Sequence, residues 1–249
     1  MRSIVCVKRV PDSEARVRIA GDGSAIDSSG VKYVMNPYDE FALEQALQLK
    51  EAAGEGTVTA ITLGSDEAKE TLRSALAMGA DEGVLLRSDG SMDGLVVARA
   101  LADEISQREF DLVLFGKQAI DDDNMQVPAM VAQLLSLPCA TVVVDMTLDS
   151  GTVTAKREVE GGHEIVEFEL PGVIAAQKGL NEPRYPSLKG IMAAKRKPLE
   201  EKDVTVSEPG LELLGLAPPP ARPEPQIVGE GPEVVPELVR RLREEAKVL

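Results

Sequence analysis

The residues best suited to chemistry form one run, GKQAIDDDNMQVP, at residues 116–128. Gly116 leaves room for close approach to the backbone, and Lys117 and Gln118 can contact a phosphate or a ribose. A helix expected to begin near Asn124 adds unpaired backbone N–H groups, which favour an anion. Asp121 to Asp123 would repel a triphosphate unless magnesium came with it. The run therefore predicts a site for a nucleotide of low charge, although two of these aspartates can simply cap the helix.

Groups that could make or break covalent bonds are scarce in the rest of the chain. The sequence contains neither GxxxxGK[ST] nor GxGxxG, and it has no HExxH, EF-hand or nucleophile-elbow pattern. The single histidine, His163, falls in an expected hairpin turn, where solvent exposure is its ordinary state. Cys6 and Cys139 form no CxxC pair and are expected in strands as small apolar residues. We therefore expect a protein that binds and docks, not an enzyme, with no catalytic residues and no metal site.

A second run, LNEPRYPSLKGIMAAKRK at 180–197, has the composition of a docking loop. Pro183 and Pro186 restrict the backbone and predict an extended segment from Glu182 to Ser187, so that little disorder is lost on binding. The residues 191–194 read as a short helix with Lys195, Arg196 and Lys197 at its end. One apolar residue, Leu188, then stands in basic surroundings. The alternative is a proline-bounded loop that ends in a solvated basic helix.

The overall composition limits the partners. The chain has 249 residues and a net charge of −15, with 3% aromatic residues and no tryptophan. These values argue against nucleic-acid binding. The exception to the acidic composition is a basic patch at 178–202, which indicates a protein partner. With no run of eighteen apolar residues and no signal peptide, we expect a soluble protein of the cytoplasm or an equivalent compartment, not a membrane protein.

The elements that must position these runs alternate between strands and helices up to about residue 145. Strands are expected at 3–10, 57–64, 83–87, 110–116 and 139–145, with helices at 40–53, 67–78, 93–106 and 125–136 and a small hairpin around Gly21–Gly23. This rhythm predicts an α/β fold with a doubly wound, mostly parallel sheet. A β-hairpin is expected at 152–170. We expect one nucleotide-binding domain over 1–216, then a proline-rich linker and C-terminal helical arm over 217–249, with the helix at 233–247.

Taken together, these residues resemble the β subunit of electron-transfer flavoprotein. The likeness is carried by VKRVPD at 7–12, MNPYDEFALEQALQLKE at 35–51, ALAMGAD at 75–81, DLVLFGKQAIDDD at 111–123, REVEGG at 157–162, and LNEPRY with its following loop at 180–197. The resemblance implies a Rossmann-like adenine nucleotide-binding fold in an obligate heterodimer with an α subunit. It also implies a carrier that accepts electrons from acyl-CoA dehydrogenase-type donors and passes them to a membrane quinone oxidoreductase.

The resemblance further implies the cofactors and the site residues. The α subunit would hold most of the shared FAD, while this chain would hold a structural AMP. AMP would lie against Cys6, Asn36, Pro37, Tyr38, Asp39, Leu63, Gly116, Lys117, Gln118, Ala119, Ile120, Asp121, Asp122, Asp123, Asn124, Met125, Gln126 and Val127. Leu188 would anchor the dehydrogenase, with Tyr185, Ile191, Met192, Lys195, Arg196 and Lys197 around it. Glu158 would contact the flavin domain, and the C-terminal arm the α subunit.

Two other functions stay open on the sequence. An electron-bifurcating relative would bind a second FAD in place of AMP and oxidise NADH, but such relatives tend to carry a G-D-T-A-Q-V-G-P run that this chain replaces with DDNMQVP at 122–128. A stand-alone adenine-nucleotide-binding enzyme on the same kind of sheet would need no second subunit. It would leave the linked tail and the docking loop without a role.

Overall fold

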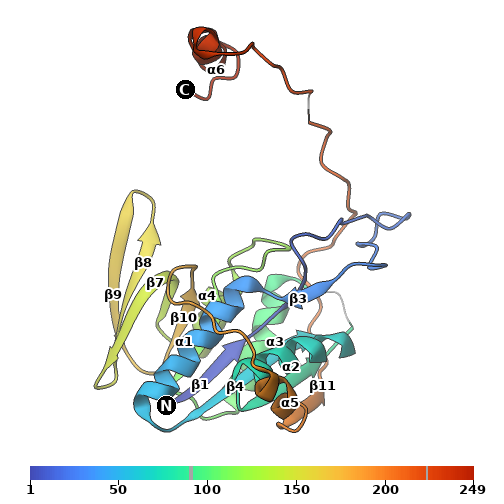
Figure 1. The fold of residues 1–249 in the computed structure, drawn as a ribbon. Coiled ribbons are helices and arrows are strands. Elements are labelled where there is room, and N and C mark those ends of the chain that lie inside the picture. Colours follow the sequence, from blue (N-terminus) through green and yellow to red (C-terminus); the bar gives the residue numbers. More distant parts are fainter. Residues whose placement is uncertain (90–91, 223) are drawn as a thin grey trace.

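A nine-stranded sheet forms the centre of the protein (Figure 1). The computed structural model describes residues 1–89, 92–222 and 224–249. The strands, in the order β11-β5-β4-β1-β6-β10-β7-β8-β9, are β11 (Leu199–Asp203), β5 (Glu82–Arg87), β4 (Thr57–Gly64), β1 (Arg2–Cys6), β6 (Leu112–Gly116), β10 (Gly172–Ala176), β7 (Cys139–Asp149), β8 (Thr152–Val159) and β9 (Gly162–Glu169). Pairing is parallel from β11 to β7 and antiparallel from β7 to β9. The predicted mostly parallel α/β fold is confirmed.

Helices cover both faces of the parallel part of the sheet. Helices α1 (Pro37–Ala53) and α2 (Lys69–Met78) pack on one face, where a core cluster joins residues such as Val5 and Leu72. Helices α3 (Gly94–Ser106) and α4 (Val127–Leu135) pack on the other, where a second cluster includes Cys6 and Ile105. Neighbouring strand residues alternate between these clusters because strand side chains alternate between faces. All five residues of β6 are buried, as expected for a central parallel strand.

The direction of chain winding reverses at β1, which lies between β4 on one side and β6 on the other. Ligands of open α/β sheets bind beyond the carboxyl ends of the strands at such a switch point. Helix α1 begins and the loop after β6 passes at this edge of the sheet, and a small antiparallel pair, β2 (Arg9–Pro11) and β3 (Tyr33–Met35), leads into α1. The topology therefore gathers the 36–39 and 116–127 runs into one place.

Several local expectations were wrong. The strand expected at 3–10 is divided between β1 and β2. The small hairpin expected around Gly21–Gly23 is present only in minimal form, as one antiparallel bridge between Ile19 and Ile26 with hydrogen bonds on either side of the turn. His163 is the second residue of β9 and pairs with Glu158, because the turn of the predicted 152–170 hairpin lies one step earlier. Strands β10 and β11 were not predicted.

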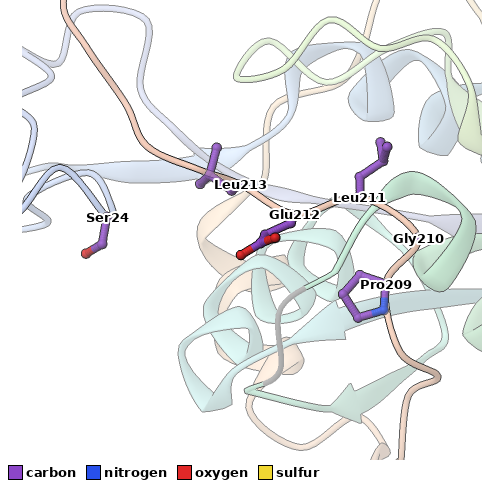
Figure 2. A pocket seen from close by; sticks show the side chains of 6 residues that line it. All are labelled: Ser24, Pro209, Gly210, Leu211, Glu212 and Leu213. Carbon is purple, nitrogen blue, oxygen red and sulfur yellow. The ribbon is translucent and has the colours of Figure 1, made fainter.

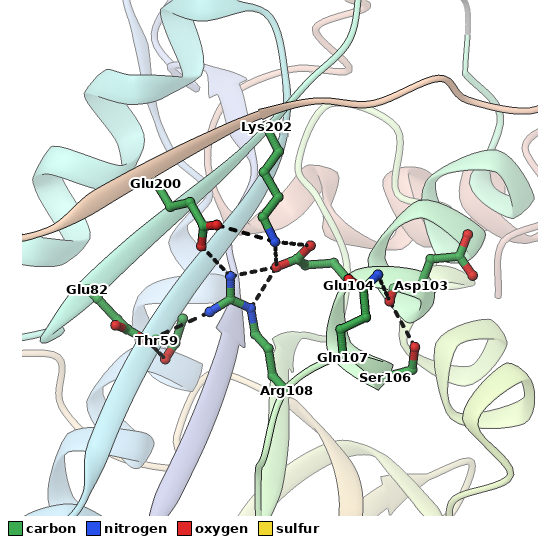
Figure 3. Close-up of polar contacts among 9 residues, drawn as sticks. All are labelled: Thr59, Glu82, Asp103, Glu104, Ser106, Gln107, Arg108, Glu200 and Lys202. Atoms are coloured by element: carbon green, nitrogen blue, oxygen red, sulfur yellow. Dashed lines mark hydrogen bonds and ion pairs between the residues drawn. The ribbon is translucent and has the colours of Figure 1, made fainter.

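Strand β11 closes one edge of the sheet and is held there by charged side chains (Figure 3). Glu104 of α3, 5% exposed, pairs with Arg108 at 2.6 Å and with Lys202 of β11 at 2.9 Å. Arg108 also reaches Glu200 of β11 at 2.6 Å. A short, charged edge strand resists pairing with other chains. Because β11 closely follows residues 180–197, this network fixes the chain at the C-terminal side of that run.

The C-terminal part leaves the sheet as an extended segment and ends in η2 (Pro232–Val234) and α6 (Val235–Glu244). Figure 1 shows α6 standing clear of the sheet at the end of this segment. The predicted helix at 233–247 is therefore present but shorter, because its first residues form the 3-10 turn. Among the helices that the structure describes, none has the length and apolar character needed to cross a membrane.

Candidate nucleotide site and docking segment

Asn36 and Asp39 form a buried polar frame beneath residues 116–127, which we call the nucleotide loop. The Asp39 carboxylate accepts hydrogen bonds from the Lys8 backbone N at 2.7 Å, Asn36 Nδ2 at 2.8 Å and the Gly116 N at 3.1 Å. Asn36 Nδ2 also donates to the Gln118 carbonyl oxygen at 2.9 Å, and Asn36 Oδ1 accepts from the Ile120 N at 3.2 Å. The frame therefore ties the segment after β1, the start of α1 and the end of β6 to the first half of the loop.

The buried frame has unusual electrostatics. Burial raises the pKa of Asp39 to about 7, although its three hydrogen-bond donors favour the ionised form. Burial, together with the nearby Asp39 carboxylate, raises the pKa of the Cys6 thiol well above its ordinary value. Cys6 is therefore a neutral, small apolar residue and a poor nucleophile. Both cysteines lie in strands, as expected.

Gly116 is required by the approach of α1. A Cβ at residue 116 would lie 2.6 Å from Tyr38 Cβ, 2.7 Å from the Tyr38 carbonyl carbon, and closer still to the Asp39 carboxylate. The sequence interpretation gave this space to a ligand, whereas the structure fills it with the first turn of α1. Pro37 is exposed at the start of that turn, and Lys117 lies over the Tyr38 ring at 5.2 Å.

The three aspartates serve the loop and not the helix. Lys8 Nζ pairs with Asp121 at 2.8 Å and with Asp122 at 3.0 Å, and Gln118 Nε2 donates to Asp123. Burial lowers the pKa of Lys8, but the two aspartates outweigh this effect and raise it overall. Helix α4 begins at Val127 instead of near Asn124, and no described side chain caps its first turn. The alternative in which two of the aspartates cap this helix is therefore wrong.

The residues expected around AMP differ in their surroundings. Cys6, Leu63 and Val127 lie together in the apolar cluster on the α3 and α4 face of the sheet. Asp121 to Gln126 are exposed, with Ala119 and Ile120 half-buried before them and Met125 43% exposed. An apolar wall and an exposed polar loop can hold a flat base and a polar tail. Asn36 and Asp39, at 1% and 4% exposed, instead position the loop.

Residues 180–197 form the second candidate surface, which we call the docking segment. Glu182 to Ser187 lack regular secondary structure, as predicted, and α5 (Leu188–Ala194) begins at Leu188 itself with the Ser187 hydroxyl accepting from the Gly190 N at 3.0 Å. The helix expected at 191–194 therefore starts one turn earlier. Leu188 is 84% exposed and Tyr185 96% exposed, while Met192 and Ile191 are also exposed. A groove of about 720 Å³ runs along α5 and is lined by Leu188, Lys189, Met192, Ala193, Arg196, Lys197 and Pro198.

The basic residues at the end of α5 have different surroundings. Lys195 and Arg196 are exposed. Lys197, in contrast, donates from Nζ to the Leu76 carbonyl at 2.9 Å and to the Ala80 carbonyl at 2.6 Å. Burial lowers the pKa of Lys197. Its ammonium group satisfies carbonyls at and just after the C-terminal end of α2, so its charge is not presented to solvent in the way that those of Lys195 and Arg196 are.

Glu158 lies at the exposed end of β8, where Gln177 Nε2 donates to its carboxylate at 2.9 Å.

A further shallow hollow of about 450 Å³ is lined by Ser24 and by Pro209 to Leu213 (Figure 2). The Gly210 and Leu211 backbone N atoms donate to Asp93, the cap of α3, at 2.7 and 3.2 Å. This hollow lies between residues 209–213, which follow β11, and the N-terminal loop that contains Ser24. Within the described ranges, no group of three acidic, histidine or cysteine side chains is arranged to hold a metal.

Comparisons with known proteins agree with the fold and with the motifs. The electron transfer flavoprotein domain model matches residues 24–207. The chain is 41% identical to the electron transfer flavoprotein subunit beta of Bacillus subtilis, with all of both chains covered. It is 40% identical to the Bradyrhizobium diazoefficiens subunit beta, again with all of both chains covered, and 38% identical to that of Mus musculus, with 100% and 99% covered. The chain therefore belongs to the beta subunits of the electron transfer flavoprotein family.

Proposed function

We propose that this chain pairs with an α subunit as a heterodimeric electron carrier. The carrier accepts electrons from acyl-CoA dehydrogenase-type flavoenzymes and passes them to a membrane quinone oxidoreductase. The α subunit holds most of the FAD, and this chain holds AMP. The observation that carries the proposal is Leu188, an apolar side chain 84% exposed on a well-fastened segment. Large exposed apolar groups on a rigid frame are typical of interface anchors.

The nucleotide loop fits AMP better than a triphosphate. Lys8 compensates Asp121 and Asp122, which limits their repulsion of one phosphate. The first turn of α4 has backbone N–H groups that no described side chain caps, and these favour an anion. Cys6, Leu63 and Val127 offer an apolar wall to the adenine. When bound, AMP would supply no redox chemistry and would act by holding the loop and the strand ends together.

The charges of the docking segment suit an acidic partner. Lys189, Lys195 and Arg196 surround the apolar groups, whereas the whole chain carries a net charge of −15. A basic rim accelerates encounter with an acidic surface, and the buried anchor slows dissociation. Recognition of the donor would therefore be confined to one basic face of an acidic protein.

The arm over residues 217–249 would lie on the α subunit. Helix α6 exposes Val235, Leu238 and Val239 at 49%, 42% and 36%, and none of its described residues is buried. An isolated amphipathic helix of this length is marginal in water, so that its apolar stripe needs a cover. In the heterodimer, the α subunit would cover this stripe.

Co-expression with the α subunit tests the assembly and its cofactors. The proposal expects a stable heterodimer that contains one FAD and one AMP. If the heterodimer instead contains two FAD molecules and NADH reduces the flavin, the second FAD occupies the site proposed for AMP and the bifurcating alternative is correct. A chain that purifies alone as a monomer and hydrolyses ATP would refute the carrier function.

Leu188→Ala tests docking. Truncating an anchor costs about 2 kcal/mol or more, so the rate of reduction by the dehydrogenase at limiting carrier should fall about tenfold or more. FAD and AMP contents should not change. Leu134→Ala is the matched control, because Leu134 is 45% exposed on α4, across the sheet. Equal reduction rates for the two variants would remove Leu188 as an anchor.

A further inference from the structure

One arginine fastens the docking segment to α1. Arg184 donates from Nε to Glu44 at 2.8 Å and from Nη2 to the other Glu44 oxygen at 2.9 Å, so the two side chains form a fork. The same guanidinium forms a second fork with Glu51 at 2.6 and 3.1 Å. The Arg184 backbone N adds a hydrogen bond to Glu44 at 3.1 Å. Bidentate arginine–carboxylate pairs are both strong and directional.

Burial makes the Glu44 half of this arrangement the important one. Glu44 is 4% exposed, whereas Glu51 is 59% exposed and its pair with Arg184 is screened by water. Burial opposes ionisation of Glu44, but the Arg184 hydrogen bonds outweigh it and hold the pKa of this carboxyl below its usual range. Glu44 also accepts from Gln48 at 3.0 Å. Removing Arg184 would therefore leave a buried carboxylate without its main partner.

A second residue supports the same attachment. Asn181 Nδ2 donates to the Phe41 carbonyl at 3.0 Å and to Gln45 Oε1 at 3.1 Å, both on α1. Asn181 and Arg184 thus both bind α1 just before the exposed residues begin. Tyr185 follows Arg184 directly, and Leu188 stands four residues after it. The backbone that carries both exposed side chains is fixed at its N-terminal end by α1.

We propose that Arg184 is the positioning residue of the docking segment, which it holds in its binding conformation before any dehydrogenase arrives. This inference rests on the proposed docking function. A segment ordered in advance loses little conformational freedom on binding, so the affinity of the carrier for its donor depends on the clamp even though Arg184 points away from the exposed tip. Its loss would raise the KM for the carrier and leave kcat unchanged, because the flavin and its route of transfer are untouched.

Hydrogen exchange of the heterodimer without dehydrogenase tests the clamp directly. In Arg184→Gln, the amides of residues 181–194 should exchange about tenfold faster or more, with no change around the nucleotide loop. Arg184→Lys keeps one ion pair but loses both forks, so its exchange should lie between those of the wild type and Arg184→Gln. Arg99→Gln makes the same charge change at an exposed position of α3, across the sheet, and should match the wild type. Wild-type exchange in Arg184→Gln would refute the clamp.

Steady-state reduction by an acyl-CoA dehydrogenase tests the consequence. The KM for the carrier should rise about tenfold in Arg184→Gln and partly recover in Arg184→Lys, at constant kcat and FAD content. A loosened segment with an unchanged KM would refute the positioning role. If Leu188→Ala also leaves KM unchanged, the docking function itself is wrong. Equal unfolding midpoints for the wild type and Arg184→Lys would show that the KM change does not reflect global unfolding.

Discussion

The junction between β6 and α1 offers a sharp test of the nucleotide site, because a single methyl group should break it. In Gly116→Ala the new Cβ would stand 2.6 Å from Tyr38 Cβ and 2.7 Å from the Tyr38 carbonyl carbon. Real Cβ atoms do not approach that closely, and two of the neighbours are backbone or near-backbone atoms of α1. Either α1 or the end of β6 must therefore move.

The cost can be estimated from two contributions. Overpacking of a well-filled site costs about 1–3 kcal/mol. A movement that separates the Gly116 N–H from Asp39 also leaves a buried donor and a buried carboxylate less satisfied, which costs about 1–3 kcal/mol more. We therefore expect a loss of about 4 kcal/mol in the free energy of unfolding, a large share of the roughly 5–15 kcal/mol that a typical domain has.

Gly64→Ala is the matched control. Gly64 ends β4, the neighbour of β1, as Gly116 ends β6, but its Cβ would meet only Ala68 Cβ at 3.4 Å, an ordinary contact. Urea unfolding of the two heterodimers, with the released nucleotide measured alongside, should show a lower midpoint and earlier AMP release in Gly116→Ala. Equal midpoints for the two variants would refute the steric argument, and equal nucleotide release would refute the link between this junction and the loop.

Three further outcomes are expected. Because burial raises the pKa of Asp39 to about 7, its favourable contribution to folding is complete below the ordinary carboxyl value and is lost as pH rises through about 7. The free energy of unfolding of the wild type, relative to that of Asp39→Asn, should fall by up to about 1.4 kcal/mol per pH unit between pH 5 and 7, and identical pH profiles would contradict this. Gly190→Ala would bring a Cβ into the Ala77 carbonyl, so α5 should leave α2 and dehydrogenase reduction should slow at constant flavin content; Gly162→Ala, with no atom within 4 Å of its Cβ, is the control. Deleting residues 232–249 removes no buried residue, so the thermal midpoint of this chain should hold while association with the α subunit weakens on gel filtration, and undiminished association would rule out the arm.

Local patterns predicted most of the sheet and its helices. The strand expected at 57–64 is β4 to the residue, because an apolar run between turn residues has one reasonable reading. Helix α1 ends where Gly54 adopts a φ of 73°, a conformation that suits glycine. Strands β10 and β11 were not predicted because they form by pairing with strands that are distant in the sequence. The five residues of β11 are mostly charged and pair with β5, more than a hundred residues earlier.

The chemistry of the site was harder to predict than its location. Asp39 looked like an ordinary acidic residue in the first turn of a helix, as did its neighbour Glu40. Its partners Lys8 and Gly116 lie 31 and 77 residues away, so no short pattern contains them. One signal was available in the sequence. Asn36 and Asp39 are three residues apart at the start of a helix, and the later strand at 110–116 ends in a glycine that leaves room for them. The surroundings of Lys197 could not be predicted for the same reason, since the carbonyl groups that its ammonium group binds lie 121 and 117 residues away in the sequence.

The two candidate surfaces share one support. Asp39, in the first turn of α1, holds the nucleotide loop, and Glu44, in its second turn, holds Arg184 and with it the docking segment. Both are buried carboxylates that accept hydrogen bonds from distant parts of the chain, whereas residues 121–126 of the nucleotide loop, and Tyr185 and Leu188 of the docking segment, are exposed. Loops attached to one helix keep a constant separation, because a helix of this length is far stiffer than either loop. The separation of the nucleotide loop from the docking segment is therefore set by α1, which gives a structural role to Asp39, Glu44 and Gln45, the polar residues among the buried positions of this helix.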